Sequence, residues 1–587
     1  MQATLFKTVD YTLSKLMHDI EMGEIGLPDI QRPFVWSNSK VRDLFDSMYK
    51  GFPVGYLLFW ETYWNNVRQN NVRQIGVDKK QKYPHLLIVD GQQRLTSLFA
   101  VLKNQKVVNR NYKPYQISIA FRPRDEKFEV TSAAIRKDPA FIPNISEVWS
   151  PIVRTRFIGN FISNLKKTTT LTKEEEDQVS IAIDKLYNIL NYPFTALELS
   201  ETVDEEDVAK IFVRINSQGV VLNQADFILT LMSVFWDEGR KNLERFCYDA
   251  RQPSIRIPSP FNYFIDPDPG QLLRVSIGLG FRRARLQYVY SILRGKDLAT
   301  ETFSDQKREE QFGILKLAQE YTLNLQNWHD FLKCLLHAGF KGQKMISSKT
   351  TLLYAYILYL IAKRDVRIEE HELRSFIAKW FFVTSLTRRY TASDTAMEAD
   401  LTILRNIRDR DDFFEAYNRV IEDTMTQDFW NISLVNSLAT SSARSPALFA
   451  YYAALSLLDA KVLFSELKIS DLLDPAYQAK KSSLERHHLF PKNYLKTIGI
   501  TQIMDVNQIA NQTFLEWFDN IDISDSPPME YLPKYLSRIS EKDYKQMCYW
   551  HALPENWERL EYTEFLKERR KLMAKIIRDG FSKIGKL

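Results

Sequence analysis

The spacing of apolar residues alternates between helical and strand periods through the first part of the chain. Residues 37–51 repeat apolar side chains at helical spacing, with Ser37 as a candidate N-cap and Gly51 as the stop. Further helices are predicted at residues 204–215 and 223–238. Short apolar runs predict strands at residues 54–60, 85–89, 115–121 and 192–199. The alternation predicts an α/β domain over residues 1–236.

Strand signals fade after residue 236, and long helical patterns continue to about residue 479. Residues 372–386 and 445–460 are two clear examples. The longest apolar run, residues 352–362, is too short to cross a bilayer and is typical of a buried helix. The pattern predicts a helical middle domain over residues 237–479.

The remaining residues, 480–587, mix the two periods. A short strand is expected around His487 and His488, followed by a helix through Asn511 to Asn520 and then further helices. No linker rich in Pro, Gly or Ser marks the boundaries between the three parts. The sequence therefore predicts an α+β multidomain fold with domains at residues 1–236, 237–479 and 480–587.

The composition favours several packed cores in a reducing compartment. Hydrophobic residues make up 45% and aromatic residues 13% of the 587, which argues against long disorder. Cys247, Cys334 and Cys548 are far apart and form no CxxC pair, so neither a disulfide framework nor a structural zinc site is expected. The first residues lack the basic start and apolar core of a signal peptide. We expect a soluble, cytoplasmic protein that does not bind membranes.

The net charge is only +6, because 79 basic residues are nearly balanced by 73 acidic ones. This charge is compatible with nucleic-acid binding through local basic patches but does not require it. One local excess lies in residues 567–587, which hold eight Lys or Arg and two acids. This segment is either a solvated helix docked by one apolar stripe or a helix that contacts phosphates. Basic pairs beside aromatic residues, at 281–290 and 388–390, allow either DNA contact or internal salt bridges.

A strand–turn–helix junction, HLLIVDGQQRLTSLFAVL, carries the first candidate chemistry. The apolar strand ends in Asp90 and Gly91, and a helix begins at about Gln92. Glycine permits a sharp turn, and the N–H groups of a helix start attract anions. Arg94 could grip the same phosphate with two hydrogen bonds, and Asp90 could hold a metal ion or a ribose hydroxyl. The alternative is an ordinary turn in which Arg94 pairs with Asp90.

Two other polar loops accompany this junction. One contains Gln31 and Arg32, and the other, residues 214–219, precedes a new helix start. Three such loops in one α/β domain favour a shared anion or nucleotide pocket.

Three segments, residues 27–55, 88–98 and 211–232, resemble in the same order the N-terminal domain of the GmrSD-type restriction proteins. The resemblance implies a ParB/sulfiredoxin-like fold whose DGQQR loop binds and hydrolyses a nucleoside triphosphate. It implies catalytic roles for Asp90 and Arg94. It implies nucleotide contacts from Gly91, Gln92, Gln93, Arg94, Gln31 and Arg32.

The second candidate centre lies in LERHHLFPKNYL, where His487 and His488, two of only eight histidines, are adjacent. A compact hairpin followed by a helix could bring Asn511 and Asn520 back to them. A nuclease needs a divalent ion on the scissile phosphate, a neutral histidine to deprotonate water and an amide to fix the histidine tautomer. The alternative is a pair of surface histidines before a proline turn.

The order His-His, Asn, Asn resembles the HNH (ββα-metal) nuclease domain, and more narrowly the C-terminal nuclease domain of GmrSD-type proteins. The resemblance implies that His488 is the general base, that His487 and Asn520 are metal ligands, and that Asn511 is the orienting amide. His487 stands where many HNH motifs carry an acidic residue, and Asn520 stands where they carry a histidine. The implied ion is Mg²⁺ or Mn²⁺.

Together the resemblances imply an NTP-regulated, metal-dependent DNA endonuclease of a prokaryotic anti-phage defence system, which acts on modified phage DNA as a monomer or a homo-oligomer. Two alternatives stay open. One is a DNA nickase and NTPase that senses phosphorothioate in the DNA backbone. The other is a nucleotide-binding switch subunit of a larger complex, with an RNA-directed or silent nuclease.

Overall fold

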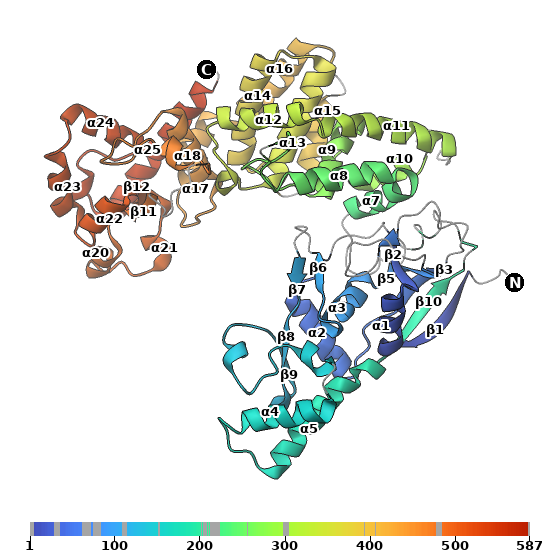
Figure 1. The fold of residues 1–587 in the computed structure, drawn as a ribbon. Coiled ribbons are helices and arrows are strands. Elements are labelled where there is room, and N and C mark those ends of the chain that lie inside the picture. Colours follow the sequence, from blue (N-terminus) through green and yellow to red (C-terminus); the bar gives the residue numbers. More distant parts are fainter. Residues whose placement is uncertain are drawn as a thin grey trace. The chain divides into compact units, whose positions relative to one another are not determined.

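Two compact units, residues 1–240 and 241–587, make up the chain in the computed structural model (Figure 1). The structure describes residues 5–28, 34, 36–61, 72–73, 84–108, 114–150, 153–200, 202–203, 208, 211, 224–254, 256–296, 304–391, 394–404, 407–476 and 484–584. Helices and strands are mixed in the first unit, whereas the second is mainly helical. The chain therefore has a mixed α+β fold.

The first unit contains a six-stranded mixed sheet with the order β1-β10-β3-β5-β2-β4. β10 runs parallel to β3, and β2 runs parallel to β5, while the other neighbours are antiparallel. The strands are β1 (Phe6–Thr12), β2 (Ile25–Pro28), β3 (Leu57–Glu61), β4 (Val72–Arg73), β5 (Leu86–Asp90) and β10 (Pro193–Leu199).

Burial on both faces explains the unbroken apolar runs of β3 and β5. Because side chains alternate along a strand, Leu57 and Phe59 enter a large core, whereas Leu58 and Trp60 enter a smaller core on the opposite face. The large core also receives the apolar faces of four helices, α1 (Leu13–Met22), α2 (Asn38–Tyr49), α3 (Gln92–Leu102) and α5 (Lys173–Tyr187). The sheet thereby fixes the point at which β5 ends and α3 begins.

Local signals account for several of the helices in this unit. The Ser37 side chain accepts a hydrogen bond from Lys40 N, which makes it the expected N-cap. The helices are α1 (Leu13–Met22), α2 (Asn38–Tyr49), α3 (Gln92–Leu102), α4 (Arg154–Leu165), α5 (Lys173–Tyr187) and α7 (Gln224–Phe235), with the short turns η1 (Pro123–Asp125), η2 (Ile135–Lys137), η3 (Ile145–Trp149) and η4 (Asn188–Asn191).

One strand prediction was wrong in its extent. The apolar run at 115–121 is divided between two strands, β7 (Pro114–Gln116) and β8 (Ile119–Arg122). They pair with different partners, β6 (Lys106–Val108) and β9 (Lys127–Val130), so one run serves two hairpins. The runs predicted at 54–60, 85–89 and 192–199 are confirmed as β3, β5 and β10. The helix predicted at 204–215 falls, except for Val208 and Ile211, outside the described residues, as does Asn223.

Residues up to 476 of the second unit are helical, as the sequence predicts. α13 corresponds to the longest apolar run and is buried from Thr351 to Ile361. It packs against α9, α12 and α14. The helices are α8 (Asp237–Asp249), α9 (Pro269–Phe281), α10 (Leu286–Leu293), α11 (Asp305–Thr322), α12 (Leu325–His337), α13 (Lys349–Ile361), α14 (Glu370–Leu386), α15 (Asp394–Ile403), α16 (Arg410–Thr424), α17 (Leu434–Ser437), α18 (Pro446–Leu457) and α19 (Ile469–Leu472).

The last part of the second unit contains a two-stranded antiparallel sheet, β11 with β12, followed by the helix α22. The helix predicted through Asn511 to Asn520 was wrong: QTFLE forms a strand, because its backbone pairs with β11, and the helix begins only at Trp517. The elements are β11 (Leu484–His488), α20 (Lys492–Thr497), α21 (Ile503–Val506), η8 (Ile509–Asn511), β12 (Gln512–Glu516), α22 (Trp517–Ile523), α23 (Pro528–Leu536), α24 (Glu541–Trp550) and α25 (Tyr562–Lys583).

The basic C-terminal helix α25 is docked by one buried stripe that includes Phe565, Met573 and Ile577. It packs against α18 on one side and against η8 on the other. The segments at 241–479 and 480–587 therefore belong to one compact unit, and the division at 240 lies close to the sequence boundary at 236. Among the described residues, no helix has the length and apolar character needed to cross a bilayer.

Replacing Gly91 should destabilise the first unit. Its φ is +100°, and an added Cβ would lie 2.4 Å from Leu57 Cδ2. We expect Gly91→Ala to lower the free energy of unfolding by about 1–3 kcal/mol in urea titrations. Gly159→Ala is the control, because Gly159 lies in α4 with open space around it and should gain about 0.5–1 kcal/mol. Equal effects of the two substitutions would contradict this explanation.

Candidate functional site

The hairpin β11–β12 and the helix α22 bring the paired histidines to Asn520. In the antiparallel ladder, His487 lies opposite Thr513 and His488 lies opposite Gln512. α22 follows β12 directly and carries Asn520. Because side chains alternate along a strand, the two imidazoles project to opposite faces of the hairpin and make different contacts. The result is a ββα arrangement.

The imidazole of His487 is directed at Asn520, with Nδ1 2.5 Å from Oδ1. Burial lowers the pKa of His487 to about 4, and the bond to Asn520 opposes the shift only in part. An amide oxygen accepts hydrogen bonds, so Nδ1 carries the proton and Nε2 keeps a lone pair. Nε2 is buried and has no hydrogen-bond partner among the described residues. His487 is therefore neutral at physiological pH, which is the state that a metal ligand needs.

A second asparagine, Asn507, holds the ring of His488, with Nε2 3.0 Å from Oδ1. Since the amide oxygen accepts, Nε2 carries the proton and Nδ1 remains a proton acceptor. Burial lowers the pKa of His488 from 6.5, an effect that Asn507 opposes and the positive charge of Lys492 reinforces. His488 thus has the protonation state of a general base.

Asn511 lies behind this pair and closes the loop that follows His488. Its side chain is fully buried; Oδ1 accepts from Phe490 N at 2.9 Å, and Nδ2 donates to Phe490 O and Val506 O, each at 3.1 Å. Its backbone oxygen accepts from Leu489 N at 2.8 Å. The amide expected to orient a histidine ring therefore orients backbone instead, and the ring of His488 is held by Asn507.

Asn507 is the residue that sequence reasoning missed. Asn507 and Asn511 are only four residues apart in VNQIANQ, and both are amides that could reach a histidine ring. Nothing in their spacing distinguishes them. Packing does, because Asn511 is fully buried while Asn507 is half-buried beside His488.

The donor atoms of His487 and Asn520 fit a divalent ion that takes few protein ligands. They offer one amide oxygen and the imidazole nitrogen that faces it, Nδ1; a bound ion would take the place of the Nδ1 proton, which would move to Nε2. Within the described part of the chain, no group of three or more His, Cys, Asp or Glu side chains could hold a metal ion. Mg²⁺ commonly keeps several waters and completes its shell with phosphate oxygens. The pair thus suits an ion shared with a phosphate substrate better than a permanently bound structural ion.

In the first unit, three acceptors of its own chain hold Arg94. Its guanidinium donates to Val54 O and Tyr56 O, each at 2.7 Å, and to Asp90 Oδ2 at 3.0 Å. Burial lowers the pKa of Arg94, and Asp90 offsets part of that shift. Gly55 permits the approach, because an added Cβ would lie 2.8 Å from Arg94 Nη1. The pairing of Arg94 with Asp90, given above as the alternative to phosphate binding, is present.

The DGQQR residues nevertheless meet at one helix start. Gly91 is the N-cap of α3 and has no side chain with which to cap that end. Gln92 is half-buried and Gln93 is buried. The N–H groups of a helix start are suited to an anion. Gln31, Arg32 and the loop at 214–219 lie outside the described residues.

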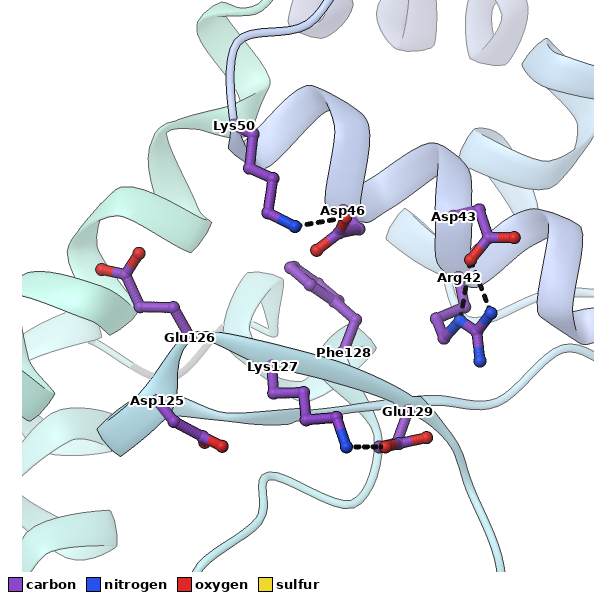
Figure 2. Close-up of a pocket in the computed structure, with 9 residues that line it drawn as sticks. All are labelled: Arg42, Asp43, Asp46, Lys50, Asp125, Glu126, Lys127, Phe128 and Glu129. Carbon is purple, nitrogen blue, oxygen red and sulfur yellow. Dashed lines mark hydrogen bonds and ion pairs between the residues drawn. The ribbon is translucent and has the colours of Figure 1, made fainter.

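A pocket of 490 Å³ lies between α2 and β9, away from these residues in sequence (Figure 2). Ion pairs join Arg42 to Asp43, Lys50 to Asp46 and Lys127 to Glu129, at 2.6, 2.7 and 2.6 Å. No lining residue comes from the Asp90–Arg94 turn, so the pocket adds nothing to the nucleotide hypothesis. The lining consists of Arg42, Asp43, Asp46, Lys50, Asp125, Glu126, Lys127, Phe128 and Glu129.

The basic pairs of the helical segment form internal salt bridges. Arg389 makes two hydrogen bonds with Asp400, at 2.8 and 2.7 Å, and Tyr390 donates to the same carboxylate at 2.6 Å. Arg283 pairs with Glu398 at 2.8 Å. Of the two alternatives for these segments, DNA contact or internal salt bridges, the structure shows the internal salt bridges.

Comparison with known proteins relates the first unit to restriction enzymes. Residues 13–233 match the family described as GmrSD restriction endonuclease, N-terminal domain. A protein of Methanocaldococcus jannaschii, described as uncharacterized, is 22% identical over 552 residues, which cover 88% of this chain and 85% of the relative. The family match contains all three segments that carry the sequence resemblance and supports it. The paired histidines lie beyond the matched residues.

Removing the Asn511 side chain should destabilise the second unit. The loss leaves the N–H and C=O of Phe490 and the C=O of Val506 buried without these partners. We expect Asn511→Ala to lower the free energy of unfolding by about 2–4 kcal/mol in urea titrations. Asn493→Ala is the control, because the exposed Asn493 side chain bonds to Asp525 alone among the described residues, and its effect should stay below about 0.5 kcal/mol. Equal small effects would show that Asn511 does not hold the loop.

Proposed function

We propose that this protein is an NTP-regulated, divalent-metal-dependent DNA endonuclease of a prokaryotic anti-phage defence system, which cuts modified DNA at the β11–β12–α22 site. The family match over residues 13–233 supports a restriction nuclease acting on DNA. One observation carries the assignment of the reaction to this site. Two adjacent neutral histidines are held through opposite ring nitrogens, His487 through Nδ1 and His488 through Nε2.

That difference gives the two histidines different chemistry. His488 presents Nδ1 as the proton acceptor, so it would deprotonate the water that attacks the scissile phosphate. Asn507 keeps its ring in the required tautomer and orientation. His488 is neutral at pH 7 because burial lowers its pKa, so it is ready to accept a proton. The role of orienting amide passes from Asn511 to Asn507.

His487 and Asn520 would hold Mg²⁺ or Mn²⁺. When bound there, the ion would polarise the phosphate and stabilise the leaving oxygen. Two neutral ligands leave most of the coordination shell to water and to DNA phosphate oxygens. Binding of the ion and binding of DNA should therefore favour each other.

The nucleotide site is proposed at the DGQQR turn. The start of α3 would receive phosphate oxygens, with Asp90 and Arg94 as the reacting side chains and Gly91, Gln92, Gln93, Gln31 and Arg32 as contacts. Because Arg94 is bound to Val54 O and Tyr56 O, a phosphate that attracts this guanidinium would disturb the segment that precedes β3. Such a change gives the nucleotide a means of switching the protein between two states.

Cleavage of paired plasmids tests this function. One plasmid is unmodified and the other carries phage base modifications, and each is incubated with Mg²⁺ or Mn²⁺, with and without a nucleoside triphosphate. The proposal predicts cuts in the modified plasmid, dependence on the triphosphate, and a loss of about 10²-fold or more in His488→Ala. Cuts that require a phosphorothioate backbone would favour the phosphorothioate-sensing alternative. Cuts confined to RNA, or none, would favour the switch-subunit alternative.

The pH dependence of cleavage tests the role of His488. A base must be unprotonated, and burial places its pKa below 6.5, so the rate should be level above pH 6.5 and fall only at lower pH. Asn507→Asp places a carboxylate on Nε2, which favours imidazolium and should move the acid limb to higher pH. The measurement is the single-turnover rate between pH 5 and 8. An acid limb unchanged by Asn507→Asp would contradict this role.

A further inference from the structure

A fully buried arginine, Arg569, lies behind the candidate catalytic hairpin. It comes from α25, the helix that sequence analysis singled out for its basic residues, yet its side chain is 0% exposed. Nη1 donates to Ala510 O at 2.7 Å and Nε donates to His551 O at 3.1 Å. The mechanism proposed above uses neither Arg569 nor His551.

No carboxylate compensates this charge among the residues that the structure describes. The aromatic groups near the Arg569 guanidinium are tyrosines, chiefly Tyr451, and Phe565, whose ring centre lies 5.9 Å from Cζ; burial lowers the pKa of Arg569. A buried cation without a counter-ion is costly, and that cost offsets what its hydrogen bonds to Ala510 O and His551 O contribute to stability. Stability alone is therefore a poor explanation for an arginine at this position.

The hydrogen bond to Ala510 O connects Arg569 to the loop that follows His488. Ala510 immediately precedes Asn511, whose side chain and backbone bind Leu489 and Phe490. Leu489 follows His488 directly in the chain. The bond from Arg569 to Ala510 O therefore fixes Ala510, the neighbour of Asn511, which closes the loop after His488.

The hydrogen bond to His551 O connects Arg569 to the strand opposite His487. His551 is buried, and its Nε2 is 2.9 Å from Lys461 O, so Nε2 carries the proton. Nδ1 then accepts from the Thr513 hydroxyl at 2.7 Å. Thr513 pairs with His487 across the hairpin. Arg569 thus holds the backbone of His551, and the His551 side chain in turn binds Thr513, the residue opposite His487.

We propose that Arg569 is a positioning residue for DNA cleavage: together with His551, it sets the relative positions of His488 and of the His487–Asn520 pair. This proposal rests on the nuclease function proposed above. Arg569 contacts no reacting group. Its bond to Ala510 O supports the loop after His488, and its bond to His551 O supports, through Thr513, the strand β12 opposite His487. An arginine suits this position because its guanidinium reaches two backbone oxygens at once.

The test compares stability with catalysis in the full-length protein. Arg569→Met keeps an unbranched side chain and removes the donors. We expect a Tm close to that of wild type, because relief of the buried charge offsets the loss of two hydrogen bonds to backbone oxygens, with DNA affinity within about twofold of wild type and a single-turnover cleavage rate lowered about 10–100-fold. Arg569→Lys, which keeps one donor for Ala510 O, should recover part of the rate. Arg578→Met is the control, because Arg578 is exposed on the same helix and, among the described residues, its side chain bonds to Gln427 alone.

A second readout does not depend on cleavage. Amide hydrogen exchange of Leu489 and Phe490 reports the closure by Asn511, and it should be faster in Arg569→Met than in Arg578→Met or wild type. Thr513→Val, an isosteric change that removes the hydroxyl bound to His551, should also slow cleavage. If Arg569→Met does not fold, Thr513→Val and Arg569→Lys provide the comparison.

The outcomes separate this inference from the proposed function. If wild type cuts DNA and Arg569→Met cuts at the same rate with the same exchange, Arg569 does not position the site. If wild type cuts no DNA, the nuclease proposal fails, and exchange at Leu489 and Phe490 alone decides whether Arg569 orders the loop. A lower Tm that accounts for the whole loss of rate would also overturn the inference.

Discussion

Four hydrogen bonds of one buried asparagine determine where the candidate catalytic groups lie. Asn511 binds Leu489, Phe490 and Val506, and so joins both ends of the loop between β11 and β12. A two-stranded hairpin with a long loop is marginally stable by itself. With the loop closed, His487 and His488 are fixed on β11, and β12 runs directly into the helix that carries Asn520.

The hairpin depends on the rest of the second unit for its remaining support. Leu463 N donates to Phe514 O at 3.2 Å, and Ile509 N donates to Thr440 O at 2.8 Å, so residues before the hairpin bind it directly. Tyr531 OH donates to Leu489 O at 2.8 Å. These bonds join the hairpin to the rest of the compact unit that residues 241–587 form, and so support the candidate site.

Much of the local structure could be predicted from sequence, because it rests on local signals. Ser37 caps α2, and the apolar run at 352–362 is buried, because capping and periodicity are properties of short segments. The strand at 512–516 could not be predicted, since its pairing with β11 lies across a long loop. The choice of Asn507 over Asn511 as the partner of His488 depends on burial, which spacing does not encode. Arg569 looked like one charge in a basic segment, and only packing shows that it is buried.

In the proposed reaction, His487 and Asn520 would hold a divalent ion together with a DNA phosphate. The most direct test is pulsed electron paramagnetic resonance of Mn²⁺ added to the full-length His488→Ala protein, with and without DNA. We predict coupling of Mn²⁺ to an imidazole nitrogen and to phosphorus when DNA is present, and loss of the nitrogen coupling in a second protein that also carries His487→Ala. Nitrogen coupling that persists without His487, or Mn²⁺ that couples to phosphorus alone, would contradict the claim.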